Sequence, residues 1–351
     1  MSTLFSPITL KDITLKNRIV VSPMCQYSSA DGFATDWHLV NLGSRAVGGA
    51  ALIFTEAAAV SPEGRISRDD LGIWKDAHIE KLKSIVDFVH DNGAVAGIQL
   101  SHAGRKASTT APWKGGKQLT ENPWVTVAPS EIAFREEYVK PIALTEEGIQ
   151  NIVSDFKAAA QRALAAGFKV VEIHAAHGYL IHQFLSPLSN LRTDAYGGSF
   201  DNRTRLLLEI LEAIQSVWPA TLPIFVRISA TDWAEDGWSV AESVKLSAIL
   251  KTKGVDLMDV SSGGLASHVK IPLSPGYQVP FAERIKKEAG ILTGAVGLIT
   301  TAEQAEQILA EEKADLIFLA RELLRDPYFP LHAAKILGDD VAWPVQYERA
   351  K

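Results

Sequence analysis

Cysteine is almost absent from this 351-residue sequence, which contains only Cys25. An internal disulfide, a zinc site built on two or four cysteines and a cysteine-ligated iron–sulfur cluster all need more than one thiol. The sequence therefore excludes all three. Any redox chemistry in this chain must use another carrier.

A basic excess and long apolar runs are lacking as well. The 41 acidic residues outnumber the 35 lysines and arginines, which gives a net charge of −6, whereas nucleic-acid-binding proteins usually carry a basic balance or stripe. No apolar run approaches the roughly 18 residues of a membrane span, and residues 1–18 contain no apolar signal core. We expect a cytoplasmic protein that binds neither nucleic acid nor membrane.

Eight short apolar runs alternate along the chain with amphipathic helical stretches. The runs are continuously apolar, which is typical of strands buried on both faces. They cover residues 18–24, 51–57, 94–100, 170–176, 223–229, 257–263, 291–297 and 315–321. Eight strands that are each followed by a helix predict an α/β protein with a closed (β/α)8 TIM barrel. An open doubly wound sheet is the alternative, but no G-x-G-x-x-G motif follows the first run to support it.

The boundaries of several helices carry local signals. Asp76, Thr145 and Thr301 suit the N-cap position, where a side-chain oxygen accepts from a free backbone N–H. Gly93 and Gly167 suit the left-handed residue that follows a helix end.

Two segments do not fit the repeat. Residues 3–16 predict a hairpin that plugs the N-terminal mouth of the barrel. Residues 103–143 form a long excursion after the third strand, at the end of the barrel where active sites lie, and we expect a lid there. No linker or internal repeat requires a second domain, so we treat residues 1–351 as one domain.

Polar residues at the C-terminal ends of barrel strands are the candidates for chemistry. They are Ser22, Cys25, Glu56, Gln99, His102, His174, His177, Arg227, Ser261, Ser262 and Arg321.

The histidine pair His174 and His177, with His182 nearby, invites a metal-site interpretation because imidazole is a common metal ligand. A metal-dependent hydrolase barrel needs several histidines together with Asp or Glu. Only the fourth strand supplies paired histidines, and Glu56 and Asp232 have no accompanying His-x-His motif. We therefore expect no metal, and His182, further along in a helix, is expected to be structural.

The remaining polar residues suit a planar heterocycle that carries a phosphate. Gln99 offers a donor and an acceptor together, the complement to a ring N–H beside a carbonyl. Arg227 is a permanent cation that stabilises negative charge on a ring. Gly294 and Gly297 end the seventh strand and Arg321 ends the eighth, where barrels commonly build a phosphate site. Together these residues indicate flavin mononucleotide, FMN.

Long segments of the sequence resemble the Old Yellow Enzyme family of flavoproteins. They are RIVVSPMCQYSS (18–29), GIQLSHAGRKA (97–107), EIHAAHGYLIHQFLSPLSNLRTDAYGGSFDNRTR (172–205) and LARELLRDPYFP (319–330). Cys25, the pair His174 and His177, and the tail QYERAK are similar to the branch that includes the YqjM ene-reductases. The resemblance extends from about residue 3 to the C-terminus.

The resemblance implies an FMN-dependent NADPH dehydrogenase, an ene-reductase of small activated alkenes such as α,β-unsaturated carbonyl or nitro compounds. NADPH or NADH would reduce the flavin, which would pass hydride from N5 to the alkene. The residues that it implies for FMN are Ser22, Pro23, Met24, Cys25, Ala57, Gln99, Arg227, Gly297, Ala320 and Arg321. Ala320 departs from the glycine of many relatives, and we expect it to be tolerated because the contact there uses backbone N–H.

For the substrate, the resemblance implies that His174 and His177 bind the oxygen of the activating group. Tyr27 would line the pocket, and Tyr179 would protonate the α-carbon, so that hydrogen adds trans. Cys25 would tune the flavin as a weak S–H donor.

The tail at residues 341–351 is expected to contact a neighbouring subunit. Trp343, Pro344, Val345 and Tyr347 offer apolar area that a disordered end would not carry. The resemblance implies that Arg349 reaches the neighbouring active site, in a homodimer or homotetramer.

Two other functions remain open at this point. One is a metal-dependent barrel hydrolase, and the other is a flavin-free barrel that only binds phosphate. Arg192, Asp194 and Arg203 are expected to brace a loop and a helix start rather than to take part in chemistry.

Overall fold

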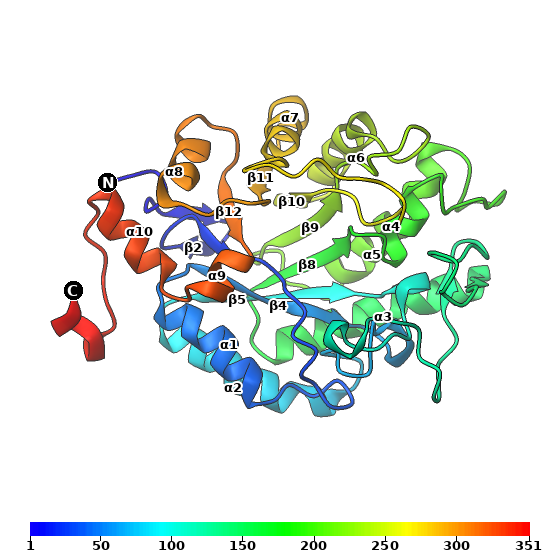
Figure 1. The fold of residues 1–351 in the computed structure, drawn as a ribbon, viewed down its shortest axis with the longest axis horizontal. Coiled ribbons are helices and arrows are strands. Elements are labelled where there is room, and N and C mark those ends of the chain that lie inside the picture. The colour runs from blue at the N-terminus through cyan, green and yellow to red at the C-terminus, as the bar shows by residue number, and fades with distance from the viewer.

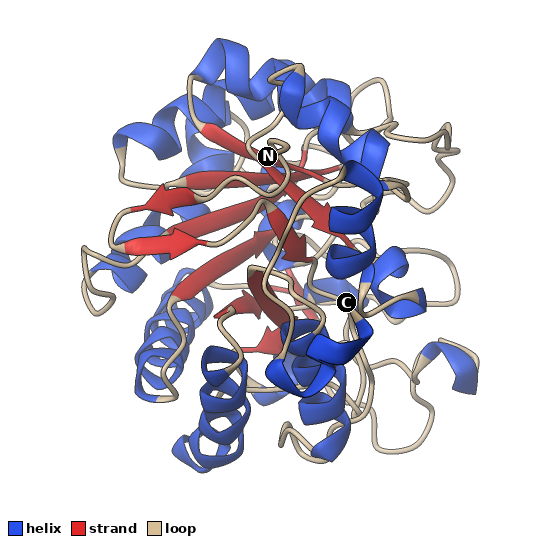
Figure 2. Ribbon diagram, turned by 90° about the vertical axis from the view of Figure 1, so that its left-hand side faces the viewer, coloured by secondary structure: helices blue, strands red, loops and turns tan.

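The computed structural model describes all 351 residues, and a closed barrel of eight parallel strands forms its centre (Figures 1 and 2). Each of the eight predicted apolar runs overlaps one strand of the barrel, and β4 and β5 extend one or two residues beyond their runs. The strands are β3 (Ile19–Val21), β4 (Leu52–Ala59), β5 (Val95–Ser101), β8 (Val170–Ala175), β9 (Ile224–Ser229), β10 (Leu257–Ser261), β11 (Leu292–Ala295) and β12 (Leu316–Leu319). The pairing of β12 with β3 closes the sheet, so the predicted TIM barrel is confirmed.

Helices surround the strands and cover their outer faces (Figure 2). The order along the chain alternates strand and helix, as the sequence pattern predicts. The helices are α1 (Asp36–Val47), α2 (Ile79–Asp91), α3 (Glu146–Ala165), α4 (Leu180–Leu185), α5 (Phe200–Gln215), α6 (Val240–Thr252), α7 (Val279–Ala289), α8 (Ala302–Ala310), α9 (Arg321–Arg325) and α10 (Phe329–Leu337). None of them combines the length and the apolarity that a bilayer crossing requires.

Most of the predicted helix boundaries are confirmed. The Thr145 and Thr301 hydroxyls cap α3 and α8, each accepting from a backbone N–H of the first turn. Gly93 and Gly167 follow α2 and α3 with φ of 66° and 93°, in the left-handed region.

The N-cap predicted at Asp76 is wrong. Asp76 is the first residue of a short 3-10 turn, Asp76–His78, and α2 begins only at Ile79. The Asp76 carboxylate instead accepts from Arg162 Nε at 2.7 Å. An ion pair with α3 therefore takes the place of the local cap.

The predicted hairpin at the N-terminal mouth is confirmed. Strands β1 (Ile8–Leu10) and β2 (Ile13–Leu15) pair antiparallel. Leu10 and Leu15 are buried in one apolar cluster with residues from the N-terminal halves of the barrel strands, among them Leu52 and Val170. The plug closes the end of the barrel opposite to the candidate site.

The excursion after β5 lies beside the C-terminal end of the barrel, opposite to the hairpin plug. It contains 3-10 turns at Gly104–Lys106 and Pro112–Lys114 and two short strands, β6 (Val127–Ala128) and β7 (Ile142–Ala143), that pair with each other. The Trp113 ring packs edge-on against that of Tyr27, with the centroids 5.6 Å apart. The excursion therefore contacts a residue expected to line the substrate pocket.

The C-terminal tail extends away from the barrel beyond α10 (Figure 1). It ends in a 3-10 helix, Val345–Ala350, in which every residue is exposed. Its one aromatic contact is between Tyr347 and Tyr328, with ring centroids 6.2 Å apart. Arg349 makes no hydrogen bond or ion pair within its own chain, so this chain leaves its side chain available to another surface.

Candidate active site

The C-terminal ends of neighbouring strands bring the candidate side chains together. The register of the barrel pairs Ala57 of β4 with Gln99 of β5, and His174 of β8 with Arg227 of β9. Gln99, His174 and Arg227 are each at most 5% exposed. Parallel strands end at the same rim, so residues distant in sequence form one buried polar layer there.

A tight turn after β8 carries the second histidine of the pair. His177 and Gly178 have φ of 58° and 73°, so two successive residues are left-handed. A Cβ on Gly178 would lie 2.2 Å from the carbonyl oxygen of Gly264, so only glycine fits. Lys106 Nζ donates to the carbonyl oxygens of His177 at 2.8 Å and Gly264 at 3.0 Å. These contacts hold the His177 ring with its centroid 5.2 Å from that of His174.

Both imidazoles of the pair are neutral at physiological pH. Burial, and next the positive charge of Arg227, lower the pKa of His174 and of His177 well below the usual value. The Ala176 N–H donates to His174 Nδ1 at 3.2 Å, so His174 carries its proton on Nε2. His177 Nε2 lies 2.7 Å from Ser261 Oγ. Each ring therefore has one N–H.

Tyr179 lies directly beside the pair. Its ring centroid is 5.1 Å from that of His174, and the Lys106 ammonium is 5.0 Å from the Tyr179 ring centroid. Burial is the main cause that raises the pKa of the Tyr179 phenol well above its usual value. The hydroxyl is therefore protonated at neutral pH and can serve as a proton donor.

Gln99 and Arg227 each contact a buried acid on a neighbouring strand. Gln99 Nε2 donates to Glu172 Oε1 at 2.7 Å, and Arg227 Nε lies 3.0 Å from Asp259 Oδ2. The amide nitrogen of Gln99 is thus engaged, which leaves its oxygen as the acceptor offered to a ligand. The ion pair engages Nε of Arg227, and the terminal nitrogens make no hydrogen bond to the protein.

The irregular chain after β3 is held by a buried acid. The Gln26 N–H donates to Glu56 Oε2 at 2.9 Å, and His38 Nε2 lies 3.0 Å from Glu56 Oε1. Burial, followed by the charges of Asp70 and Glu56, raises the pKa of the neighbouring Cys25 thiol well above its usual value. A thiol in this setting stays protonated and is a poor nucleophile.

The flanking residues of this chain also face the rim. Ser22 is buried, and its hydroxyl has no hydrogen-bond partner in the protein. Pro23 and Met24 are half-buried, and Tyr27 is left-handed with φ of 48°. A buried hydroxyl without a partner is uncommon in native proteins and is consistent with a ligand above it.

A cavity of about 230 Å³ lies beside the ends of β11 and β12. Gly297, Ala320 and Arg321 line it, as expected for the phosphate, and Ser261 connects it to the histidine pair. Gly297 has φ of 120°, and a Cβ there would lie 2.8 Å from Gln278 Nε2. Ala320 has φ of −103°, outside the left-handed region that favours glycine.

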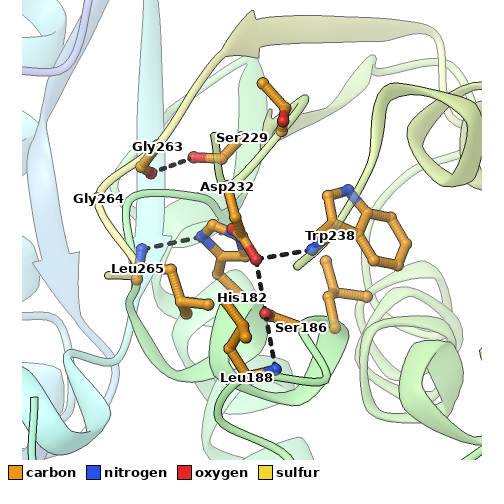
Figure 3. Close-up of polar contacts among 12 residues, drawn as sticks. His182, Ser186, Leu188, Ser229, Asp232, Trp238, Gly263, Gly264 and Leu265 are labelled. Atoms are coloured by element: carbon orange, nitrogen blue, oxygen red, sulfur yellow. Dashed lines mark hydrogen bonds and ion pairs between the residues drawn. The ribbon is translucent and has the colours of Figure 1, made fainter. Parts of the chain in front are cut away.

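His182 braces the histidine turn from inside the protein, as expected of a structural residue. Its Nδ1 accepts from the Gly178 N–H at 2.9 Å, and its Nε2 lies 2.8 Å from Asp232 Oδ1. Asp232 also accepts from Ser186 Oγ at 2.6 Å and the Trp238 N–H at 2.7 Å (Figure 3). Burial alone raises the pKa of Asp232, but the His182 imidazole and these hydrogen bonds outweigh it and hold the pKa below its usual value.

The loop after α4 is braced by the residues predicted for that role. Arg192 Nε donates to Asp194 Oδ1 at 3.0 Å, and Arg192 Nη1 donates to the Pro129 carbonyl at 3.1 Å. Arg203 donates to the carbonyl oxygen of Leu185. All of these contacts hold the chain in place, and none faces the rim residues.

Three charged residues near the rim went unnoticed in the sequence: Lys106, Glu172 and Asp259. The only signal for the two acids is a single charge inside an otherwise apolar strand, in VVEIHAA and LMDVSSG. No group of three or more His, Cys, Asp or Glu side chains is arranged to hold a metal ion.

A barrel with an arginine-lined cavity at the ends of β11 and β12, and with a buried amide, guanidinium and histidine pair at the same rim, is typical of oxidoreductases that hold a flavin. Comparison with known proteins then gives the family. The chain belongs to the NADH:flavin oxidoreductase / NADH oxidase family, whose model matches residues 3–340.

Its relatives agree with this assignment. A NADPH dehydrogenase of Listeria innocua serovar 6a is 54% identical over 352 residues, which cover 100% of this chain and 99% of that protein. Morphinone reductase in complex with tetrahydroNAD aligns with a TM-score of 0.79 at 27% identity, covering 97% of this chain and 92% of that one. The Old Yellow Enzyme homologue from Zymomonas mobilis aligns with a TM-score of 0.78 at 26% identity, covering 98% and 95%.

The protein is therefore an oxidoreductase of the Old Yellow Enzyme type that uses FMN and a nicotinamide cofactor, and the resemblance to this family is confirmed. The assignment to the YqjM branch stays a prediction. The site fits FMN. The unpartnered Ser22 hydroxyl, the free acceptor of Gln99 and the free guanidinium nitrogens of Arg227 are donors and acceptors without protein partners. The cradle at Gly297, which a Cβ would fill, fits the phosphate.

Replacing both His174 and His177 with alanine is expected to leave FMN bound and to weaken the binding of phenolic ligands. Each lost donor to an oxyanion costs about 2.7–4 kcal/mol, so the loss of both should raise Kd about ten-thousandfold or more. Spectral titration of the bound flavin with a substituted phenol measures this change.

His332→Ala, an exposed histidine far from the rim, is the control and should titrate like the wild type. Chelators should have no effect on the wild-type enzyme. Loss of activity with EDTA that zinc restores would replace the anion-binding interpretation of the pair with a metal site.

Proposed function

We propose that the protein reduces the activated C=C bond of α,β-unsaturated carbonyl or nitro compounds with NADPH. One arrangement carries the proposal. The neutral imidazoles of His174 and His177 lie together at the rim that fits FMN, and the ring centroid of the protonated Tyr179 phenol is 5.1 Å from that of His174. Two N–H donors and one acid can serve an oxygen and a carbon of the same small molecule. A site that only oxidised a nicotinamide would need none of them.

In this proposal the residues of the rim hold the flavin. Gln99 would accept from the ring N–H, and Arg227 would offset negative charge at the pyrimidine edge. Ser22, Pro23, Met24, Cys25 and Ala57 would line the ring, and Gly297, Ala320 and Arg321 would hold the phosphate. FMN supplies a carrier that takes hydride from the nicotinamide and gives it to the alkene.

His174 and His177 form the anion clamp of this mechanism. His174 offers Nε2–H, because its Nδ1 accepts from the backbone. Ser261 Oγ lies 2.7 Å from His177 Nε2 and 3.3 Å from Gln278 Oε1, which also accepts from Ser262 Oγ at 2.6 Å. In this proposal the Ser261 hydroxyl donates to the nearer His177 Nε2 and keeps the proton of that ring on Nδ1. Two fixed donors then meet the oxygen on which negative charge develops, in a site of low dielectric constant.

Tyr179 donates the proton that completes the reduction. Its raised pKa makes the phenol a weak acid, but an enolate is a strong enough base to take the proton. Lys106, whose pKa burial lowers to about 7, has its Nζ 5.0 Å from the ring centroid and would stabilise the phenolate in its protonated form. Cys25 stays protonated and acts as a weak S–H donor near the ring rather than as a nucleophile.

Tyr179→Phe is expected to slow alkene reduction roughly 10²–10⁴-fold, the usual contribution of a general acid. Flavin reduction by NADPH should change little, since only the alkene step needs a proton on carbon. Stopped-flow measurement of the two half-reactions separates the effects, with Tyr196→Phe, in the loop after α4, as the matched control. Equal slowing of both half-reactions would make Tyr179 a packing residue.

We further propose that the tail completes the active site of a neighbouring subunit in a homodimer or homotetramer. Arg349 is exposed and unpaired in its own chain, and Val345 and Tyr347 beside it expose apolar area. A rim that holds oxygen anions would gain from a cation brought by the partner.

Arg349→Ala is expected to raise KM for the alkene roughly ten- to a hundredfold, the effect of one hydrogen bond to a charged group, without loss of FMN. Lys351→Ala in the same tail is the control. Hybrids of an Arg349→Ala subunit with a subunit lacking both His174 and His177 should regain activity, because one site then has both parts. Light scattering that finds a monomer, or inactive hybrids after verified exchange, would refute the shared site.

A further inference from the structure

Three charged side chains from adjacent strands share the barrel interior beneath the proposed pyrimidine edge. They are Glu172 of β8, Arg227 of β9 and Asp259 of β10, and the register places Asp259 directly beside Arg227. Glu172 and Asp259 are 0% exposed. The proposed mechanism uses Arg227 but gives neither acid a role.

The cluster has too few partners for its acids. Arg227 Nε lies 3.0 Å from Asp259 Oδ2, and Glu172 Oε1 accepts from Gln99. Neither oxygen of Asp259 accepts a well-aligned hydrogen bond, and Glu172 Oε2 accepts none. Two buried carboxyls thus share one cation, and a buried carboxylate without hydrogen bonds is strongly disfavoured.

The surroundings supply no second cation to this layer. β8 contributes Glu172 and the neutral His174, β5 contributes Gln99, and β11 contributes no titratable side chain between Leu292 and Ala295. Below the layer lie Phe54, Phe225 and Phe318. Arg227 alone therefore balances the acids.

The two acids hold their protons with different strength. Burial, and then the charge of Asp259, raises the pKa of Glu172 well above its usual value, so Glu172 is neutral at physiological pH. Burial raises the pKa of Asp259 to about 6 against the opposing effect of Arg227. Asp259 is therefore ionised near neutrality, but only narrowly.

We propose that Asp259 takes up one proton from solvent for each hydride that the bound flavin accepts from NADPH. Hydride transfer would convert NADPH to NADP⁺ and leave one negative charge on the flavin, whose pyrimidine edge Arg227 would hold. Arg227 then faces two anions in a medium of low dielectric constant, where the repulsion between them is large. Protonation of the Asp259 carboxylate removes one of them and leaves the guanidinium to the ring.

The proposal rests on the placement of the pyrimidine edge against Gln99 and Arg227 given above. It fixes a proton count. NADPH, the flavin and one solvent proton give NADP⁺, a reduced flavin with one negative charge and a neutral Asp259. Without uptake at Asp259 the same reduction consumes no solvent proton.

The test is a proton count on the FMN-loaded enzyme under anaerobic conditions without alkene. NADPH is added at pH 7 in weak buffer with an indicator dye, and flavin bleaching is followed in the same cuvette. Wild-type enzyme should consume about one proton per flavin reduced, and addition of NADP⁺ alone to the oxidised enzyme corrects for binding. Full bleaching with no proton consumed would overturn the proposal and leave the proposed function intact. Absence of bleaching would count against the function itself.

Two variants locate the proton. Asp259→Asn should consume none, whereas Glu172→Gln, which replaces an already neutral acid with a neutral amide, should still consume one. The inference is wrong if the Asn variant, loaded with FMN, takes up protons like the wild type.

If the Asn variant does not fold, the pH dependence of the flavin reduction potential in the wild-type enzyme tests the proposal instead. Near neutrality the potential should fall by about 60 mV per pH unit, since each proton per two electrons contributes about 30 mV. A slope of about 30 mV per pH unit over the same interval would show that only the flavin itself takes up a proton.

Discussion

The pairing of β12 with β3 is the constraint on which the rest of the structure depends, because it closes the sheet and makes all eight strands end at one rim. Gln99, His174, Arg227 and Ser261 come from four different strands, yet closure places them in one buried layer. The hairpin plug of Leu10 and Leu15 fills the opposite mouth with apolar side chains. Polar groups can therefore be buried at one end without opening the core to water at the other.

Burial then sets the chemistry of that rim. The same loss of solvent keeps His174 and His177 neutral and the Tyr179 phenol protonated, so each offers a proton rather than a charge. Arg227 is the fixed cation of the layer. Asp259 Oδ2 lies 3.0 Å from Arg227 Nε. Because charges interact strongly in a dry interior, any charge that the reaction adds near Arg227 changes the electrostatic energy of the Asp259 carboxylate. Burial thus accounts both for the protonation states of the histidine pair and Tyr179 and for the proposed proton uptake at Asp259.

Much of this could be predicted from the sequence, since both the strands and the flavin-binding segments leave local patterns. Continuous apolar runs predicted all eight barrel strands, and Thr145 and Thr301 marked helix starts because their caps need only neighbouring residues. The N-cap prediction at Asp76 failed because the partner of its carboxylate, Arg162, is distant in sequence. Glu172 and Asp259 were missed for the same reason, since nothing in a strand shows which residue faces a charge across the barrel. Arg349 remains a prediction because its proposed partner is another chain.

The cofactor of the purified protein tests most directly whether this rim holds one FMN. The protein should absorb visible light as a flavoprotein, and denaturation should release FMN at about one equivalent per chain. Release of FAD would contradict the assignment of the cavity beside Gly297 and Arg321 as a terminal phosphate site. A colourless protein that binds no FMN after incubation with it would contradict the account as a whole.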